Sequence, residues 1–288
     1  MSTSPESDVA ALALETVLVE RQGPVAVLTL NRPRVRNAID DQMRADLRRA
    51  VDHLADQVAS TAVRGVVLAG AGPAFCAGGD IRGMQDRLDQ GALAAELGWR
   101  RQRELHATLE KLHDLGAPTL AAVHGTAAGL GLDVAMTCDF VWLADSAVVA
   151  ASFVKRGLVP DGGGMYHLPR RVGLARAKEL IFSGRSVDAS EAHRIGLADR
   201  VLAERDLRAA AIAFLGGLAE QPPLAHALAK GVLNRSLGLD LAEVNELGGQ
   251  AQAICYGSPA HTESVRRFLA ERDARRASRA TQTQGTPS

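Results

Sequence analysis

The chain has 288 residues, of which 47% are hydrophobic, and its 33 basic residues balance its 33 acidic ones. This length provides for one core with or without a helical appendage, and a net charge of zero disfavours nucleic acid as a main partner. Three cysteines at unrelated spacings, without a CxxC or HExxH motif, predict a reducing compartment and neither a disulfide framework nor a metal site.

Both ends of the chain are polar, and we expect residues 1–14 and 276–288 to be disordered. The first residues lack the basic and apolar regions of a signal peptide. Apolar runs also fall short of the ~20 residues that span a bilayer. We therefore expect a cytoplasmic protein that does not act at a membrane.

The first half of the chain alternates between strand and helix patterns. Residues 17–20 and 25–30 predict a hairpin, and 41–59 predict a helix capped by Asp40 or Asp41. Next come a buried strand at 63–69, a helical stretch at 84–115, a strand at 119–123, a helix at 129–138 and a strand at 140–143. This alternation predicts an α/β fold with a largely buried sheet over residues 15–204.

The residue pattern changes at about Leu207. Ala/Leu-rich helical runs follow, interrupted by Pro222-Pro223, Gly238 and residues 257–259. We expect an all-helical C-terminal region over residues 205–275.

Two glycine-rich turns carry the strongest functional signal. Residues 74–81 (AFCAGGDI) and 125–135 (GTAAGLGLDVA) each follow a strand pattern and lead into a helical one. Such a turn leaves backbone N–H groups unpaired at the helix start. One turn alone is typical of a simple strand–helix connection, but two side by side could aim two donors at one oxygen, forming an oxyanion hole.

Together with further motifs, these turns resemble the crotonase superfamily, which has the enoyl-CoA hydratase/isomerase fold. The resemblance runs from about Val17 to about Arg272. The further motifs are LNRP at 30–33, RNA at 36–38, MTCD at 136–139, GLVPDGG at 157–163, LPRRVG at 168–173 and AHRIGL at 192–197.

The resemblance implies a spiral of ββα repeats, followed by the helical C-terminal region. In the family that region builds a homotrimer or a dimer of trimers. The implied substrate is an acyl-CoA thioester, so coenzyme A enters as part of the substrate and no cofactor is bound permanently.

Alignment to the family motif places the two oxyanion donors on the amides of Ala77 and Leu130. Gly78, Gly79 and Gly129 then let the thioester approach the backbone closely. The helix dipole adds partial positive charge at Leu130.

Hydratases of the superfamily use two glutamates, and these align with Asp133 and Phe153. The first carboxylate is therefore one methylene shorter, and the second is replaced by an aromatic ring. Adding water needs one group to orient it and one to deliver a proton. The replacement at Phe153 consequently disfavours standard hydratase chemistry.

Asp161 offers another acid/base. A subset of the superfamily carries Val-Pro-Asp-Gly-Gly and isomerises enoyl-CoA esters with this aspartate, and the isomerases of phenylacetyl-CoA catabolism resemble the chain most. One carboxylate suffices for a proton shift, and Phe153 would help by excluding water from the pocket. As alternatives, Pro-Asp-Gly is a turn sequence, and Asp133 could bond its own helix start or a neighbouring loop.

The resemblance also assigns residues to coenzyme A. Arg34 and Arg36 would hold the nucleotide phosphates, and Ala74 and Phe75 would line the path of adenine and pantetheine. Phe268 and Arg272 fall at positions that can reach the coenzyme A of the same or a neighbouring subunit. Taken alone, each arginine is better interpreted as a solvated surface residue.

Three hypotheses follow for the function. The first is an enzyme that shifts a double bond in an unsaturated acyl-CoA, with Asp161 as acid/base. The second is a hydratase that uses Asp133 and another group, and the third is a non-catalytic protein that binds CoA esters. We expect residues 82–116 to shape the acyl pocket, whose preferred acyl group the composition does not reveal.

Overall fold

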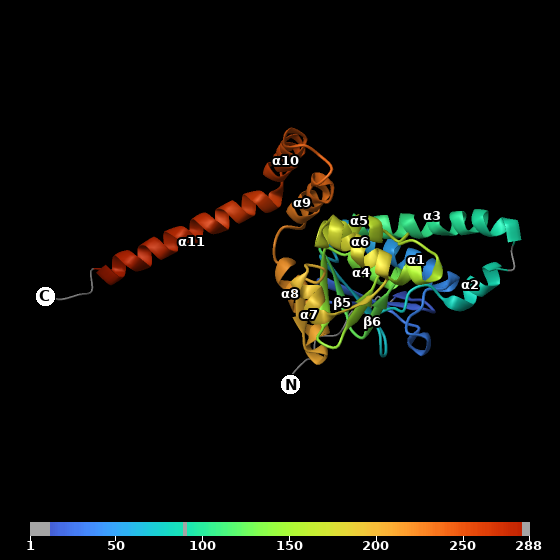
Figure 1. Cartoon of the computed structure of the whole chain (residues 1–288). Helices are drawn as coiled ribbons and strands as arrows, with labels where there is room; N and C mark the ends of the chain where they lie inside the picture. The colour runs from blue at the N-terminus through green and yellow to red at the C-terminus, as the bar shows by residue number, and fades with distance from the viewer. Residues whose placement is uncertain (1–11, 89–90, 284–288) are drawn as a thin grey trace. The chain divides into compact units, whose positions relative to one another are not determined.

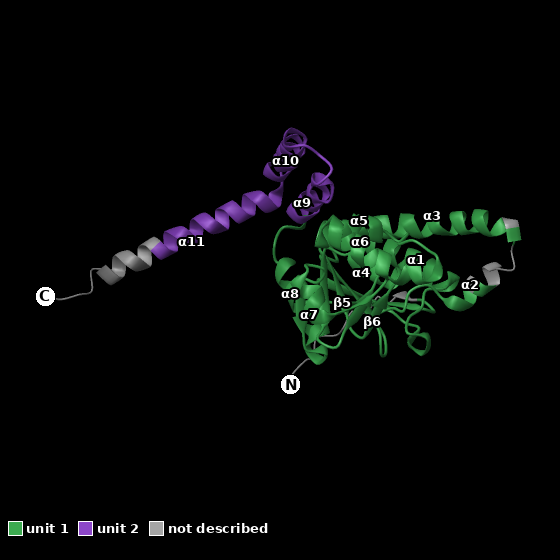
Figure 2. Ribbon diagram, viewed as in Figure 1, with its two compact units in different colours: residues 1–223 green, residues 224–288 purple. Residues whose placement is uncertain are grey.

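The computed structural model describes residues 12–88 and 91–283 (Figure 1). The chain forms two compact units, residues 1–223 and 224–288 (Figure 2). The first unit holds both sheets and helices α1 to α8, and the second consists of helices.

A seven-stranded sheet forms the centre of the first unit, in the order β1-β2-β3-β4-β5-β7-β10. Its strands are β1 (Leu12–Ala13), β2 (Val17–Gln22), β3 (Val25–Leu30), β4 (Gly65–Gly70), β5 (Thr119–Val123), β7 (Phe140–Ala144) and β10 (Arg200–Leu202). Pairing is antiparallel from β1 to β3 and parallel from β3 to β10. Strands β3 and β5 are buried along their whole length, as expected for strands covered on both faces.

A smaller sheet of β6 (Thr126–Ala128), β8 (Val148–Ala150) and β9 (Ser186–Asp188) lies beside it. The chain passes from β5 to β6 and into α4 (Leu130–Met136), and it passes from β7 to β8 in the same way. After β4, Cys76 extends the smaller sheet through a parallel bridge to Ala127. Each turn thus contributes to one sheet and then to the other, which confirms the predicted spiral of ββα repeats.

Helices cover the sheets of the first unit (Figure 1). They are α1 (Asp41–Ala59), α2 (Ile81–Leu88), α3 (Ala94–His113), α5 (Gly164–Val172), α6 (Leu174–Ser183), α7 (Ala189–Arg194) and α8 (Glu204–Leu218), with short 3-10 helices η1 (Pro33–Val35), η2 (Gly91–Leu93) and η3 (Ser152–Arg156). Asp40 caps α1 by accepting the Met43 N–H at 2.8 Å. Buried Asp46 joins α1 to the start of β2, because it accepts the Thr16 N–H at 2.9 Å and the Thr16 hydroxyl at 2.8 Å.

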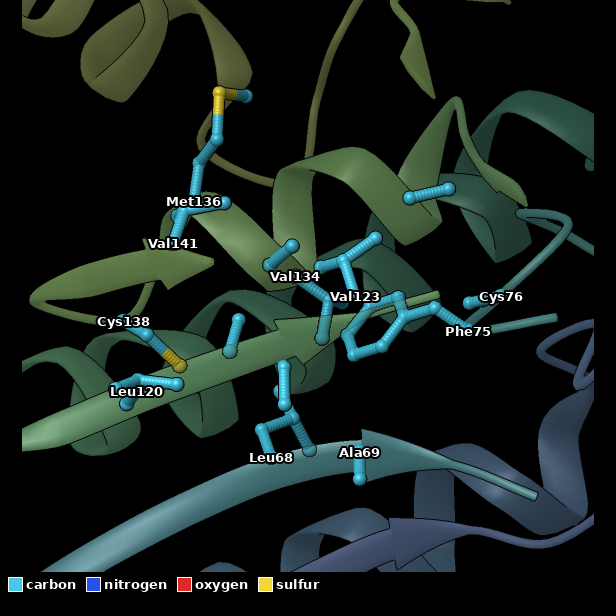
Figure 3. Close-up of a cluster of buried hydrophobic side chains, with 14 of the residues drawn as sticks. Leu68, Ala69, Phe75, Cys76, Leu120, Val123, Val134, Met136, Cys138 and Val141 are labelled. Atoms are coloured by element: carbon cyan, nitrogen blue, oxygen red, sulfur yellow. The ribbon is translucent and has the colours of Figure 1, made fainter. Parts of the chain in front are cut away.

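The hydrophobic core gathers between β4, β5 and α4 (Figure 3). Phe75 is fully buried there and belongs to the same cluster as Val123 and Val134, which the close-up also labels. Helix α8 packs against β4, β5 and β7, where Phe214 meets the Trp142 ring at 5.0 Å. The division between the two units therefore falls after Pro223, later than the expected boundary at residue 204.

The second unit comprises α9 (Pro223–Ser236), α10 (Leu241–Tyr256) and α11 (Pro259–Thr283). Asp240 and Glu243 form a capping box at the start of α10, with both hydrogen bonds at 2.9 Å. Burial is described for residues 224–275 of this unit, and none of them is buried. Leu233, Leu237 and Leu241 are each at least 68% exposed.

The structure describes only part of the two terminal segments that we expected to be disordered. Residues 12–13 form β1, and α11 continues to Thr283, so these parts of the two terminal segments are ordered. Residues 1–11 and 284–288 of those segments lie outside the described residues. Among the described helices, none combines the length and the apolar character that crossing a bilayer demands.

Helices without buried residues gain little stability from their own packing, so we predict that self-association covers the apolar face of α9 to α10. Light scattering should then give three or six times the chain mass of 30.3 kDa. Leu233→Arg should lower this mass, whereas Arg235→Ala, an exposed position on the same helix, should leave it unchanged. A mass of one chain for the unaltered protein would contradict the prediction.

Candidate active site

Asn37 ties together the two loops that frame the candidate site. Its buried Nδ2 donates to the carbonyls of Ala71, Ala74 and Phe75 at 2.9, 2.7 and 3.1 Å. Its Oδ1 accepts the Arg32 N–H at 2.8 Å, and its backbone has a φ of 57°, a conformation that asparagine tolerates better than most residues. This one side chain explains the Arg-Asn-Ala motif, because it fixes residues 71–75 against the loop before α1.

Residues 76–80 run between two neighbouring segments, and Gly78, at a φ of 98°, interrupts the strand-like alternation of their amides. The Cys76 N–H donates to the Thr126 carbonyl at 3.0 Å. On the other side, the N–H groups of Ala77 and Asp80 donate to the carbonyls of Arg36 and Ile39 at 2.9 and 3.0 Å. The Ala77 amide is therefore already used within the fold, which contradicts its expected place as an oxyanion donor.

Gly79 replaces Ala77 as the available donor. Its neighbours Gly78 and Asp80 bond Ile39 in a parallel bridge, so the Gly79 N–H points away from Ile39. Within residues 12–88 and 91–283 this amide has no hydrogen-bond acceptor. The segment also runs close to α4, since a Cβ on Gly78 would lie 3.5 Å from the Leu130 nitrogen.

Leu130 begins α4, as the alignment predicted. Its N–H, like that of Gly79, has no acceptor among the described residues. Gly129 precedes it at a φ of 52° and a ψ of −124°, which a residue with a side chain rarely adopts. The structure thus brings an unpaired amide at a helix start beside the glycine-rich segment at residues 76–80.

Asp133 is fully buried one turn into α4. Its Oδ2 accepts the Gly162 N–H at 3.0 Å, which matches the alternative that it bonds a neighbouring loop. Burial raises the pKa of Asp133 to about 7, the Gly162 amide opposes the rise, and the nearby charge of Asp161 adds to it. The carboxyl group therefore holds its proton up to near-neutral pH.

Asp161 lies at the wall of a cavity of about 350 Å³. The next residue, Gly162, contacts α4 so closely that a Cβ there would lie 2.5 Å from Leu130 Cδ1 and 3.0 Å from Asp133 Cβ. Asp161 is partly exposed, in contrast to buried Asp133. Of these two carboxylates, only Asp161 reaches the cavity.

Phe153 lies in η3 and packs against the core next to the second glycine turn. A Cβ on Gly129 would lie 3.9 Å from its Cε2 and 4.0 Å from its Cζ. An apolar ring therefore occupies the neighbourhood of the Leu130 amide, at the position where the hydratases carry their second glutamate.

The residues expected to bind coenzyme A divide into three groups. Arg34 and Arg36 are exposed in the loop at η1, where they are accessible to a phosphate. Ala74 and Phe75 are buried in the core at 1% and 0% exposure, so their side chains do not line a path for adenine or pantetheine. Phe268 and Arg272 lie on α11 in the second unit, and their role stays a prediction.

Cys76 is an unsuitable nucleophile although it adjoins the glycine turn. Burial raises the pKa of the Cys76 thiol to about 12, against a smaller opposing effect of the Gly78 amide. The Sγ donates to the Asn37 carbonyl at 3.1 Å. The thiol is therefore a packed part of the scaffold.

Sequence reasoning named none of the cavity's histidines or its tyrosine, although His106 and His113 fall within residues 82–116, which we expected to shape the acyl pocket. His106 and His113 line the cavity from α3, and Tyr166 and His167 line it from α5. The spacing of seven residues between His106 and His113 places them on one face of a helix, which is a signal the sequence did carry. Nothing in the sequence indicated that α5 would meet this face.

The raised pKa of Asp133 predicts how the stability of the fold depends on pH. Because its folded-state pKa lies above its ordinary value of 3.8, ionisation favours the unfolded chain. This loss of stability is absent below about pH 4, grows up to about pH 7 and is complete above it. Relative to Asp133→Asn, the unaltered protein should lose about 3 kcal/mol between pH 5 and 8, as measured by urea unfolding.

Placing an amide beside Gly164 changes the free energy of unfolding by an amount that does not depend on pH. Taking the difference between pH 5 and pH 8 removes this amount. Asp56→Asn, at an exposed position on α1, is the matched control and should show no such trend. Parallel stability curves for Asp133→Asn and the unaltered protein would show that Asp133 is ionised when folded.

Comparisons with known proteins agree with this geometry. A sequence model of the family described as enoyl-CoA hydratase/isomerase matches residues 20–277. The 1,2-epoxyphenylacetyl-CoA isomerase of Escherichia coli (strain K12) is 34% identical over 260 residues, which cover 90% of this chain and 97% of that protein. The short-chain-enoyl-CoA hydratase of Clostridium acetobutylicum is 31% identical over 264 residues, which cover 91% of this chain and 97% of that protein.

The fold gives the same result. A crystal structure of an enoyl-CoA hydratase/isomerase from Cupriavidus metallidurans CH34 matches with a TM-score of 0.82 and 32% identity, covering 90% of this chain and 95% of that one. Sequence and structure therefore show that the chain belongs to the enoyl-CoA hydratase/isomerase family of the crotonase superfamily.

Proposed function

We propose that this enzyme shifts a double bond in an unsaturated acyl-CoA, with Asp161 as its acid/base. The observation that carries the proposal is the unequal placement of the two aspartates. Asp161 reaches the cavity, whereas Asp133 is buried and bonded to the Gly162 backbone. A proton shift needs one carboxylate that both removes and returns a proton.

The steps follow from this arrangement. The Asp161 carboxylate takes a proton from the carbon next to the thioester carbonyl of a 3-enoyl-CoA. The electron pair of that C–H bond delocalises into a dienolate, and negative charge develops on the thioester oxygen. The protonated Asp161 then returns the proton to the γ carbon, which gives the 2-enoyl-CoA without gain or loss of atoms.

The amides of Gly79 and Leu130 would hold the oxygen on which charge develops. Both lack acceptors among the described residues, and the segments that carry them lie side by side. We therefore assign the first donor to Gly79 in place of Ala77. Backbone donors fixed by the fold require no reorganisation when the charge appears, which is why such sites stabilise enolates well.

Asp133 acts in this scheme as a positioning residue. Its hydrogen bond to Gly162 fixes the residue that follows Asp161. Its pKa of about 7 leaves it at most about half ionised up to pH 7, which limits its repulsion of the Asp161 carboxylate. Phe153 adds an apolar wall that excludes water from the neighbourhood of the Leu130 amide.

Coenzyme A would lie along the exposed side of the loop that contains Arg34 and Arg36. The Ala77 side chain is exposed beside the Gly78–Gly79 segment and offers a surface for the pantetheine arm. The relative from Escherichia coli is named an isomerase, which supports the reaction class. Cys76, Cys138 and Cys255 form no disulfide, which supports a reducing, cytoplasmic location, and cell fractionation can test it.

A second candidate function is hydration, because Glu110 also lines the cavity. Glu110 and Asp161 together would supply the two carboxylates that adding water requires. The relative from Clostridium acetobutylicum is named a hydratase. Turnover of 2-enoyl-CoA in H₂¹⁸O separates the two functions, since only hydration gives a heavier 3-hydroxyacyl product that carries the labelled oxygen.

Asp161→Asn should lower kcat for 3-enoyl-CoA by about a hundredfold to ten-thousandfold, because the amide cannot take up the proton. The assay follows the moved double bond in D₂O by mass spectrometry. Asp145→Asn, on the exposed turn after β7, serves as control and should keep full activity. Unchanged turnover by Asp161→Asn would exclude it as the acid/base, and a large loss in Glu110→Gln would favour the hydratase.

Leu130→Pro tests the oxyanion donor. Proline is well accepted at the first position of a helix and removes the N–H of that residue alone. We expect kcat to fall by about 10²–10³, whereas Leu130→Ala, which keeps the N–H, should fall far less. Urea unfolding of both variants checks that they are equally folded, and equal kcat values would show that the Leu130 amide does not bind the thioester oxygen.

A further inference from the structure

The loop that carries Asp161 holds the two oxygens of the buried Asp133 carboxyl group unequally. Oδ2 accepts the Gly162 N–H at 3.0 Å, whereas Oδ1 is buried and has no hydrogen-bond partner in residues 12–88 and 91–283. An ionised carboxylate only accepts hydrogen bonds, and its charge is tolerated in a protein interior where donors reach both oxygens. Ionised Asp133 would therefore need a second donor at Oδ1.

Gly164, at the start of α5, is in position to supply that donor. A Cβ on this residue would lie 2.2 Å from Asp133 Oδ1, so its backbone runs directly beside the oxygen. Its N–H belongs to the first turn of α5, where amides have no acceptor within the helix, and no described residue accepts it. This amide already favours the charged form of Asp133, although it makes no hydrogen bond with Oδ1 in this arrangement.

The loop combines a backbone that allows a small movement with close packing that transmits it. Three glycines follow Asp161 at residues 162–164, and Gly163 has a φ of 97°. Packing against α4 is tight, since a Cβ on Gly162 would lie 2.5 Å from Leu130 Cδ1. A shift at the end of this short loop therefore changes the position of Asp161.

Burial is the main influence on the protonation of Asp133. It raises the pKa of this carboxyl to about 7, and the nearby charge of Asp161 adds to the rise. Strands β5, β6 and β7, which contact α4, carry no titratable side chain. Near pH 7, Cys76 and His167 are uncharged, because burial raises the pKa of the thiol to about 12 and lowers that of the imidazole to about 4.

Other titratable or charged groups lie on the segments around α4 and the cavity. They are Asp80 after the glycine turn, Tyr166, Arg170 and Arg171 on α5, and His106, Glu110 and His113 on α3. Asp80 pairs with Arg32 at 3.0 Å, and Arg171 donates to the Asp139 carbonyl at 3.0 Å. His113 Nδ1 contacts the Thr137 carbonyl at 3.3 Å, at the end of α4, so a test has to separate its protonation from that of Asp133.

We propose that Asp133 is a charge switch for the reaction: while it is protonated the loop holds Asp161 at the cavity, and when it ionises Gly164 is drawn onto Oδ1 and Asp161 leaves its catalytic position. The proposal rests on the proposed function, in which Asp161 is the acid/base. A second effect acts in the same direction, because Asp133 lies in the first turn of α4. Its negative charge there opposes the positive partial charge that the Leu130 amide offers to the enolate oxygen.

The dependence of kcat/KM on pH tests the switch. Neutral Asp133 is the active form, so kcat/KM for 3-enoyl-CoA should fall by at least about tenfold between pH 6 and 8.5, with a midpoint near pH 7. Asp133→Asn cannot ionise, so its kcat/KM should stay level and exceed that of the unaltered protein by about tenfold at pH 8.5. A folded Asp133→Asn that is nearly inactive at every pH, or that shows the same decline, overturns the proposal.

Two further variants serve as controls. His113→Gln removes the imidazole at the end of α4 and should keep the decline with its midpoint near pH 7. Asp145→Asn, on the exposed turn after β7, should keep both the rate and the decline. A level profile in His113→Gln would assign the decline to the imidazole and would contradict the switch.

Nuclear magnetic resonance of the unaltered protein tests the movement, so the result does not depend on how Asp133→Asn folds. The Gly162 and Gly164 amide protons should move downfield with one midpoint near pH 7, and Gly164 should move further because its hydrogen bond is new. This midpoint should agree with that of kcat/KM. A Gly164 amide that does not respond, or whose midpoint differs from that of kcat/KM by more than about one pH unit, overturns the proposal.

The outcomes separate the charge switch from the proposed function. Gly162 and Gly164 amides that titrate together, in a protein that isomerises no 3-enoyl-CoA, support the movement of the loop and count against the isomerase. Isomerisation that depends on Asp161, with a decline in kcat/KM that Asp133→Asn retains, overturns the switch and leaves the isomerase standing.

Discussion

The close packing of α4 between two backbone segments is the constraint on which the site depends. A Cβ on Gly131 would lie 2.4 Å from the Cys76 carbonyl oxygen, and a Cβ on Gly164 would lie 2.2 Å from Asp133 Oδ1. Because glycine alone fits these positions, the start of α4 lies against both the 76–80 segment and the loop that carries Asp161. Two amides that are unpaired among the described residues therefore lie in neighbouring segments, and the loop that carries Asp161 packs against the same helix start.

This packing also gives the two aspartates different chemistry. Asp133 is enclosed by its helix and the Gly162–Gly164 backbone, so its pKa is raised to about 7 and its Oδ2 binds the Gly162 backbone. Asp161 lies only a residue from that contact but faces the cavity. Residues of one type thus differ in role because they differ in burial, as is common where acid and base functions must coexist.

The cavity wall and the helical unit each have a feature that lies away from the reacting atoms. Helices α3 and α5 bring imidazoles from distant parts of the chain onto one cavity wall. In residues 224–275 of the second unit, by contrast, apolar side chains remain exposed. The first feature belongs to the candidate active site, and the second favours assembly.

The sequence by itself determined the family through its motifs, the ββα spiral through the resemblance that those motifs carry, and the helical C-terminal region through its Ala/Leu-rich runs, because motifs and helical runs are local patterns. Alignment to the family motifs also nominated Asp133, Phe153, Leu130 and Asp161 as candidate site residues. Tertiary structure alone decided that Gly79, and not Ala77, keeps a free amide, since this depends on which side of residues 76–80 meets Ile39. It also decided that Phe75 enters the core and that His106 and His167 share a cavity. Hydrogen-bond direction, burial and contact between distant helices are set by the packing of whole elements, and no local pattern encodes them.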